Sequence, residues 1–518
     1  MVDCVVVANI DTSVEERLST SDQTSKTCCR RQYVKYMNKK LYYNEFFSQL
    51  RVGDSQWEPR NEFKKRQLTL CEIPSFDASF LASHLEKQGI TTHYINYYNG
   101  MIDEFVDTLN KGCRFVVLSL GAMFNSIPIV KFVRTVKRSH PEVKIIVSGS
   151  YIYNKRATSD DNEYMKAMEI IGADFYITQL PGERQIEYII KTILSKGVSG
   201  NEKFEELQYA EMDVNWDYHY ALGEAPVMYL KTSKGCPAKC SFCNFPIKNQ
   251  NLTYSDLEIV NRQLNDLSAR NIKSIIFLDD TLNIPNQRFD DICKLIIKNG
   301  YDFTWYCYCR LKELTEESVR LMVESGCAGV YVGIESADDK ILKAMNKGAS
   351  LKDYDRGLQL LHKHGIPTFA FLLVGFPGET KETINTTINY LNNAPIKYFT
   401  ANLWYADVST PIYEKQEIYR LEGKHFAWRH ATMDSLEAAM ITDQIMMEVE
   451  SAIWVPNENF GFQGIPYLFS KGYSEKDVSI ILKDTQKLVE SNITGEVSSC
   501  QRYIDRISNV LNKKAKEK

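Results

Sequence analysis

The stretch KGCPAKCSFCNFP, residues 234–246, decides how this chain is interpreted. It places three thiols, Cys236, Cys240 and Cys243, at spacings of four and three residues, directly after the apolar run VMYLKTS. Thiolates are the usual ligands of iron–sulfur clusters. Three of them leave one iron of a cubane cluster without a protein ligand, and therefore open to a small molecule. The motif predicts a [4Fe-4S] cluster with one vacant coordination position.

Zinc is the main alternative ligand for such a loop. A structural zinc site needs four ligands in tetrahedral geometry. No Cys or His near the loop supplies an obvious fourth, since Cys293, Cys307 and Cys309 lie far along the chain. An iron–sulfur cluster is therefore favoured, and a noncatalytic zinc or iron–sulfur binding protein remains the alternative from another functional class.

On both sides of the loop, short apolar runs alternate with helical patterns. Helices are expected to begin near Ser255, to run from Thr315 to Gly326, and to run from Ser336, with Asp339 as its capping-box partner, to Gly348. This alternation predicts a partial (β/α)6 barrel within residues 201–415, whose site lies at the carboxyl ends of the strands. The expected strands are VMYLKTS, SIIFLDDT, YDFTWYCYCRL, AGVYVGIES, PTFAFLLVGFPGE and YFTANLWYADVSTP.

Residues 1–200 show a second strand–helix alternation, which predicts a doubly wound, Rossmann-like α/β domain. The first strand is VDCVVVANI, and an irregular insertion occupies about residues 11–65. The further expected strands are QLTLCEIP, TTHYINYY, RFVVLSLG, VKIIVSGS and ADFYITQLPGE. Such sheets bind ligands beyond the carboxyl ends of their strands. Small or polar residues there would let a large ligand approach the backbone, although tight turns explain them equally well: Ser119, Gly121, Ser148, Gly149, Gln179 and Glu183.

The Cys-x3-Cys-x2-Cys loop after the first strand of a βα series resembles the signature of the radical S-adenosylmethionine (SAM) superfamily, over about residues 225–415. In that family the open iron binds the amino and carboxylate groups of SAM. An electron from the cluster then cleaves the sulfonium and gives a 5′-deoxyadenosyl radical. The resemblance implies a [4Fe-4S] cluster and SAM as cofactors, and an electron donor such as flavodoxin or ferredoxin as a partner.

Further positions match this family by motif. The resemblance implies that Phe242 lies near the adenine and that Asp279 or Asp280 of FLDDT reaches the SAM amino group, in place of the more usual Gly-Gly-Glu. Arg310 would pair with the SAM carboxylate, for which a guanidinium has matched geometry. Glu335 would face the ribose. Gly375 and Pro377 of GFPGET resemble the turn beside the adenine, and the alternative for each charged residue is a structural ion pair at the barrel mouth.

An α/β domain before the barrel resembles the group of these enzymes that carries an N-terminal cobalamin-binding domain. Most of that group are methyltransferases, in which cobalamin relays the methyl group. The Asp-x-His-x-x-Gly motif that supplies an imidazole to cobalt is absent, because none of the eight histidines lies in that pattern. The expectation is a cobalamin-dependent methyltransferase acting on an unactivated carbon of a peptide or natural product.

The alternative activity is a radical SAM enzyme without methyl transfer, such as a peptide epimerase, a cyclase or a ring-rearranging enzyme. An epimerase needs a hydrogen-donating thiol, for which Cys307, Cys309 and Cys327 are candidates. A methylthiotransferase is disfavoured, because no second N-terminal trio of spaced cysteines is seen.

Residues 416–518 are expected to be mostly helical and to help build the substrate pocket. Aromatic and polar side chains gather on both sides of the boundary: Trp404, Tyr405, Asp407, Trp428, Arg429 and His430. His430 and Tyr405 are the candidate acid or base groups. Packing in a hydrophobic core explains the same aromatic residues.

Composition and charge indicate which partners and which cellular location to expect. The chain has 518 residues and a net charge of −4, from 62 basic and 66 acidic residues, which argues against a nucleic-acid or anionic-membrane surface. No apolar run is long enough to span a bilayer, and the start MVDCVVVANI lacks the basic region of a signal peptide. With thirteen cysteines and no export signal, the expectation is a cytoplasmic protein with reduced thiols.

Overall fold

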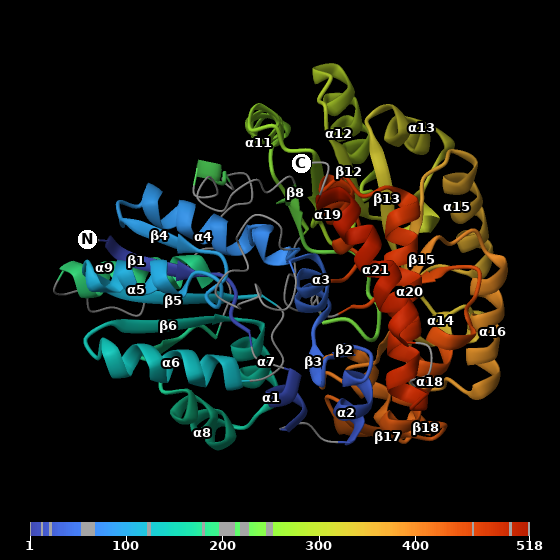
Figure 1. The fold of residues 1–518 in the computed structure, drawn as a ribbon, viewed down its shortest axis with the longest axis horizontal. Coiled ribbons are helices and arrows are strands. Elements are labelled where there is room, and N and C mark those ends of the chain that lie inside the picture. Colours follow the sequence, from blue (N-terminus) through green and yellow to red (C-terminus); the bar gives the residue numbers. More distant parts are fainter. Residues whose placement is uncertain are drawn as a thin grey trace.

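The computed structural model describes residues 2–11, 14–19, 23–52, 68–121, 126–178, 182–195, 213–217, 227–244, 252–457, 460–496 and 500–515. Figure 1 shows a smaller parallel sheet on the N-terminal side and a larger helix-flanked sheet on the other. In this part of the chain, no helix is both long enough and apolar enough to cross a membrane.

The N-terminal sheet has five parallel strands in the order β4-β1-β5-β6-β7. The middle residues of its central strands are apolar and buried, which is typical of a parallel sheet covered on both faces. The predicted α/β fold is confirmed here. The strands are β1 (Val2–Val7), β4 (Thr92–Ile95), β5 (Cys113–Leu120), β6 (Lys144–Gly149) and β7 (Phe175–Tyr176), and the helices are α4 (Phe76–Lys87), α5 (Ile102–Asn110), α6 (Ile127–Ser139), α7 (Ser150–Thr158), α8 (Asp161–Ile171) and α9 (Gly182–Ser195).

One strand expected in this region is wrong. QLTLCEIP contains a 3-10 helix, Leu70–Glu72, instead of a strand. Thr69 caps this turn by accepting a hydrogen bond from the Cys71 N–H, and Asn96 donates its amide to the Cys71 and Ile73 carbonyls. The backbone groups are thus satisfied by side chains and not by a neighbouring strand.

The larger sheet has seven strands in the order β19-β15-β14-β13-β12-β11-β8, all parallel. The six predicted barrel strands lie side by side in chain order, so the partial barrel is confirmed; β19 was not expected. The strands are β8 (Val227–Leu230), β11 (Ser274–Phe277), β12 (Thr304–Tyr308), β13 (Cys327–Glu335), β14 (Thr368–Val374), β15 (Tyr398–Leu403) and β19 (Ile453–Trp454). The helices are α11 (Leu257–Ala269), α12 (Asn286–Asn299), α13 (Glu316–Glu324), α14 (Asp339–Ala344), α15 (Leu351–Lys363) and α16 (Lys381–Asn393).

Two helix starts in the barrel show how well capping was predicted. Thr315 caps α13 by accepting from the Ser318 N–H, as expected. The expected capping box at Ser336 is wrong. The Asp338 side chain caps α14 instead, by accepting hydrogen bonds from the Lys340 and Ile341 N–H groups. Ser336 is fully buried and its hydroxyl has no partner. The helix also ends at Ala344, before Gly348.

The C-terminal region is helical, as predicted, and also contains a small antiparallel sheet that was not expected. The helices are α17 (Gln416–Tyr419), α18 (Ser435–Glu448), α19 (Gly464–Ser470), α20 (Glu475–Thr494) and α21 (Cys500–Ala515), and the sheet consists of β16 (Glu422–Lys424), β17 (Ala427–His430) and β18 (Met433–Asp434).

The part of the insertion at residues 23–52 packs against this C-terminal region. Asp443 of α18 forms ion pairs of 2.8 Å with both Arg30 and Arg31. Asn512 of α21 donates to the Leu50 carbonyl over 2.9 Å. Figure 1 shows this blue segment beside the red C-terminal helices. The segment consists of α2 (Gln23–Cys29), β2 (Val34–Tyr36), β3 (Lys39–Leu41) and α3 (Tyr43–Val52), and α1 (Val14–Ser19) precedes it.

Candidate active site

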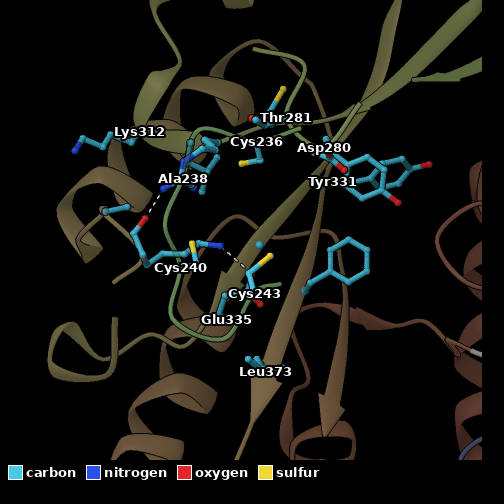
Figure 2. Close-up of a pocket in the computed structure, with 18 of the residues that line it drawn as sticks. Cys236, Ala238, Cys240, Cys243, Asp280, Thr281, Lys312, Tyr331, Glu335 and Leu373 are labelled. Atoms are coloured by element: carbon cyan, nitrogen blue, oxygen red, sulfur yellow. Dashed lines mark hydrogen bonds and ion pairs between the residues drawn. The ribbon is translucent and has the colours of Figure 1, made fainter. Parts of the chain in front are cut away.

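A cavity of about 370 Å³ opens at the carboxyl ends of the barrel strands. Figure 2 shows the cysteine loop on one side of it, with Asp280, Tyr331 and Glu335 around the same space. The cavity brings together residues that are distant in the sequence, and seven of the predicted site residues line it: Cys236, Phe242, Cys240, Cys243, Asp280, Arg310 and Glu335.

The cysteine loop follows β8 and the short strand β9 (Ser233–Lys234), which pairs with β10 (Thr253–Tyr254). Gly235 begins the loop with a φ of 95°, a conformation that favours glycine, and its N–H donates to Asp280 over 3.1 Å. Further along, the Ser241 N–H donates to the Met345 carbonyl over 2.8 Å, and Asn346 donates to the Lys239 carbonyl over 2.6 Å. The loop is therefore held at both ends by the barrel.

The three thiols border one cavity and suit a multi-iron cluster. Among the described residues, no three His, Cys, Asp or Glu side chains lie as close together as the ligands of a single metal ion. Cys236, Cys240 and Cys243 all line the cavity, and thiolates are the usual donors to iron–sulfur clusters. Burial raises the pKa of Cys236, and the nearby Arg310 guanidinium opposes that rise by favouring the thiolate.

The two adjacent aspartates occupy different places. Asp279 is fully buried and accepts hydrogen bonds from the Thr232 N–H and hydroxyl and from the Ser233 hydroxyl, so it fastens the end of β8 to the end of β11. Asp280 lines the cavity. Burial raises the pKa of both carboxyl groups. Asp280 is the one of the two that a ligand in the cavity can reach.

Arg310 and Glu335 line the cavity together with Lys347, which sequence reasoning missed. The Lys347 ammonium lies 2.8 Å from Glu335, and its carbonyl accepts a hydrogen bond from the Arg310 guanidinium. Lys347 follows a helix that was expected to extend to Gly348, and no spacing pattern marks it as different from other lysines. An aromatic part of the lining was missed for the same reason, because Tyr308, Tyr331 and Phe371 resemble ordinary strand residues.

Gly375 and Pro377 do not line the cavity. Gly375 has a φ of 90°, and a Cβ atom there would lie 2.5 Å from the Trp428 ring. The Gly375 N–H donates to Glu379 over 2.6 Å. Burial raises the pKa of Glu379 to about 8. This turn is therefore packed closely against the C-terminal region.

The two predicted acid or base residues also lie outside the cavity lining. His430 is buried, stacks on Trp428 with ring centroids 5.2 Å apart, and contacts the Gly375 carbonyl over 3.2 Å. Burial lowers the pKa of His430, which keeps the imidazole neutral. Tyr405 stacks on His425 with centroids 5.2 Å apart, and burial raises its pKa to about 12. Their surroundings are those of packed aromatic residues.

The carboxyl edge of the N-terminal sheet brings four of its predicted residues together. Ser119 pairs with Ser148, and a Cβ atom on Gly149 would lie 1.9 Å from the Leu120 carbonyl oxygen, so β5 and β6 approach closely only because residue 149 is glycine. Among the residues that the structure describes, and apart from its chain neighbours, none has an atom within 4 Å of the Cβ position of Gly121.

Glu183 lies near the same edge, and Gln179 lies outside the described residues. Burial raises the pKa of Glu183, and Lys234 and Lys231 oppose that rise. Lys231 also lowers the pKa of Asp280, which lines the cavity. The charge of one lysine therefore acts on a carboxyl group at the edge of the N-terminal sheet and on one at the barrel mouth.

Comparisons with known proteins agree with this geometry. Residues 230–391 match the family model of the radical SAM superfamily. The chain is 32% identical over 181 residues to an uncharacterized methyltransferase of Pyrococcus horikoshii, a match that covers 35% of this chain and 39% of the relative. This chain therefore spans well under half the length of that relative.

Two solved structures resemble the fold. TsrM, a radical SAM methyltransferase from Kitasatospora setae solved with cobalamin and a [4Fe-4S] cluster, superposes with a TM-score of 0.60 at 14% identity, covering 86% of this chain and 97% of that one. The cobalamin-dependent radical SAM enzyme OxsB, solved with aqua-cobalamin, gives a TM-score of 0.61 at 14% identity, covering 100% and 84%. At these identities the likeness establishes the architecture alone.

Proposed function

We propose that this protein, whose residues 230–391 match the family model of the radical SAM superfamily, is a cobalamin-dependent radical SAM methyltransferase acting on an unactivated carbon of a peptide or natural product. One observation carries the proposal. The three closely spaced thiols share a single cavity with Asp280, Arg310 and Glu335, at the carboxyl ends of the barrel strands. A thiolate trio beside one guanidinium and two carboxylates suits a cluster together with a zwitterionic ligand.

The residues of the cavity have separate roles in this proposal. When bound, a [4Fe-4S] cluster with an open iron supplies the electron for reductive cleavage of SAM. Arg310 presents a planar fork for a carboxylate, Asp280 accepts hydrogen bonds from an ammonium group, and Glu335 accepts them from ribose hydroxyls. Phe242, on the loop itself, offers a flat apolar surface.

The N-terminal sheet supports the cobalamin part of the proposal. Its carboxyl edge carries polar side chains at Ser119, Ser148 and Glu183, and within the described part of the chain no residue other than its chain neighbours approaches the Cβ position of Gly121. Both solved structures described above hold cobalamin. The chain has no Asp-x-His-x-x-Gly motif, so it would offer cobalamin no histidine ligand from that pattern.

Anaerobic purification and reconstitution test the proposal. We expect about four irons per chain with the visible absorbance of a cubane cluster, and binding of one cobalamin with a corrinoid spectrum. Iron without any retained corrinoid would contradict the methyltransferase while leaving a radical SAM enzyme. Neither iron nor corrinoid would contradict both.

One observation favours the second candidate, a radical SAM enzyme that returns a hydrogen atom to its substrate. Cys309 borders the cavity, and its sulfur lies 3.3 Å from that of Cys307. Burial raises the pKa of Cys307 well above its usual value, so that thiol keeps its proton. Candidate peptides treated in D2O separate the two activities by mass spectrometry, because methyl transfer adds a methyl group and hydrogen return adds a single deuterium that Cys309→Ala would remove.

A further inference from the structure

Lys347 and Glu335 form an ion pair in the wall of the cavity. The ammonium nitrogen lies 2.8 Å from the carboxylate oxygen, and the two side chains are only 12% and 13% exposed. Both residues line the cavity. Burying two charges costs desolvation free energy that their attraction barely offsets, so such a pair is weak evidence of a stabilising role. Its place in the cavity wall calls for another explanation.

The backbone around Glu335 is shaped to admit this pair. Glu335 has a φ of 61°, in the left-handed region that residues with side chains rarely adopt, and the register of β13 against β14 shifts between Gly333 and Glu335. A Cβ atom on Gly333 would lie 2.2 Å from the Glu335 carboxylate and 2.8 Å from the Lys347 nitrogen. The strand thus turns the carboxylate toward the cavity, and the missing side chain at 333 leaves room for the ammonium.

Lys347 also contacts the other two elements of the cavity. Its nitrogen lies 5.7 Å from the centroid of the Phe242 ring, which is within range of a cation–π interaction. Its carbonyl accepts a hydrogen bond from Arg310, and the preceding residue, Asn346, holds the Lys239 carbonyl of the cysteine loop. One lysine therefore connects the loop, the β13 bulge and the end of β12.

We infer that Lys347 is a positioning residue for the nucleoside part of a sulfonium nucleoside cofactor: its ammonium holds the Glu335 carboxylate, and its approach to Phe242 fixes the ring. This inference rests on the proposed function. Ribose hydroxyls donate hydrogen bonds, so they need an acceptor held in a fixed orientation. Without the ammonium, the Glu335 carboxylate loses the contact of 2.8 Å that orients it in the cavity wall. Lys347 acts through Glu335 and does not contact the reacting atoms.

Binding of S-adenosylhomocysteine to the reconstituted holoprotein, measured by equilibrium dialysis without turnover, tests the inference. We expect Lys347→Met to weaken binding at least about tenfold, as expected for loss of a charge-assisted hydrogen bond. The conservative Lys347→Arg should recover most of the affinity. Lys340→Met, at an exposed lysine on the preceding helix, should bind like the unchanged protein. Iron content and melting temperature, measured in parallel, show whether each variant is loaded and folded.

Two comparisons separate positioning from a direct or merely structural role. Because Lys347 acts through Glu335, the double variant Lys347→Met/Glu335→Gln should bind no more weakly than Glu335→Gln alone. 5′-Methylthioadenosine, which lacks the amino-acid group, should lose as much affinity in Lys347→Met as S-adenosylhomocysteine does. Loss confined to S-adenosylhomocysteine would mean that Lys347 binds the carboxylate directly, and would overturn the inference.

The outcomes also separate this inference from the proposed function. If the unchanged protein binds S-adenosylhomocysteine and Lys347→Met binds it equally well, the inference fails and the proposed function stands. If the iron-loaded, unchanged protein binds no S-adenosylhomocysteine, the proposed function fails first and the inference fails with it.

Discussion

At the scale of single residues, the cysteine loop shows how closely spacing in the sequence predicts proximity in the structure. Cys236, Cys240 and Cys243 lie on one short loop, so their shared position at the cavity needs no long-range information. Arg310 and Glu335 required the expectation that strand ends meet at one edge of the barrel. Both line the cavity, whereas the choice between Asp279 and Asp280 needed the hydrogen bonds of Asp279.

Residues whose position depends on tertiary packing could not be predicted. Lys347 faces the cavity because Gly333 has no side chain and Glu335 has left-handed backbone, and neither condition is visible in a pattern of residue types. His430 and Tyr405 have suitable chemistry in the sequence. Stacking on Trp428 and His425 places them elsewhere.

Glu379 gives the protein a pH-dependent stability. Burial raises its pKa to about 8 from 4.5, so between these values the folded state keeps a proton that the unfolded state releases. Raising the pH therefore favours unfolding throughout that window, and the effect is complete above pH 8. Relative to wild type, Glu379→Gln should gain about 1 kcal/mol in free energy of unfolding per pH unit across the window. Urea denaturation at several pH values measures this, and parallel curves for the two proteins would contradict it.

At the scale of elements, periodicity predicted the strands and helices of the barrel because each strand is continuously apolar and each helix is amphipathic. The failures are short elements whose conformation is set by side-chain hydrogen bonds. Thr69 and Asn96 turn an apolar run into a 3-10 helix. The two-residue strand β19 exists only because β15 offers an edge on which it pairs.

The cap of α14 distinguishes the structure from the sequence-based expectation. Asp338 accepts two backbone hydrogen bonds at the helix start, whereas the Ser336 hydroxyl is buried without a partner. Asp338→Ala should therefore destabilise the protein by about 1 kcal/mol. Ser336→Ala should leave the stability unchanged or raise it slightly, because it removes an unsatisfied polar group. Chemical denaturation measures the free energy of unfolding of both variants. A greater loss of stability in Ser336→Ala than in Asp338→Ala would show that Ser336 is the cap.

At the scale of the whole molecule, the insertion near the N-terminus joins the C-terminal helices. Composition alone left this segment unassigned, because its partners lie about four hundred residues away in sequence, as in the hydrogen bond between Arg30 and Asp443 with a separation of 413. Phe46 and Phe47 belong to the same hydrophobic core as the barrel. The insertion near the N-terminus therefore packs against the C-terminal helices and shares the hydrophobic core of the barrel. Contacts between segments so far apart in the sequence cannot be predicted from local sequence patterns.

Asp443 provides a test of this contact between the insertion and the C-terminal helices. Its carboxylate pairs with Arg30 and Arg31, and removing one partner of a largely buried pair leaves the other charge uncompensated. Asp443→Ala should lower the free energy of unfolding by about 3 kcal/mol and increase amide hydrogen exchange in α2. Glu448→Ala, on the exposed end of the same helix, is the matched control. Unchanged exchange in α2 would show that the ion pairs do not fasten the segment.

Reductive cleavage of SAM shows whether Cys236, Cys240 and Cys243 hold a cluster whose open iron binds SAM, as proposed. Anaerobically reconstituted protein is reduced in the presence of SAM, and 5′-deoxyadenosine is quantified. We expect the unchanged protein and Cys500→Ala to release 5′-deoxyadenosine, and Cys240→Ala to remain folded and release none. Release by Cys240→Ala, or no release by the iron-loaded unchanged protein, would rule out this role of the three cysteines.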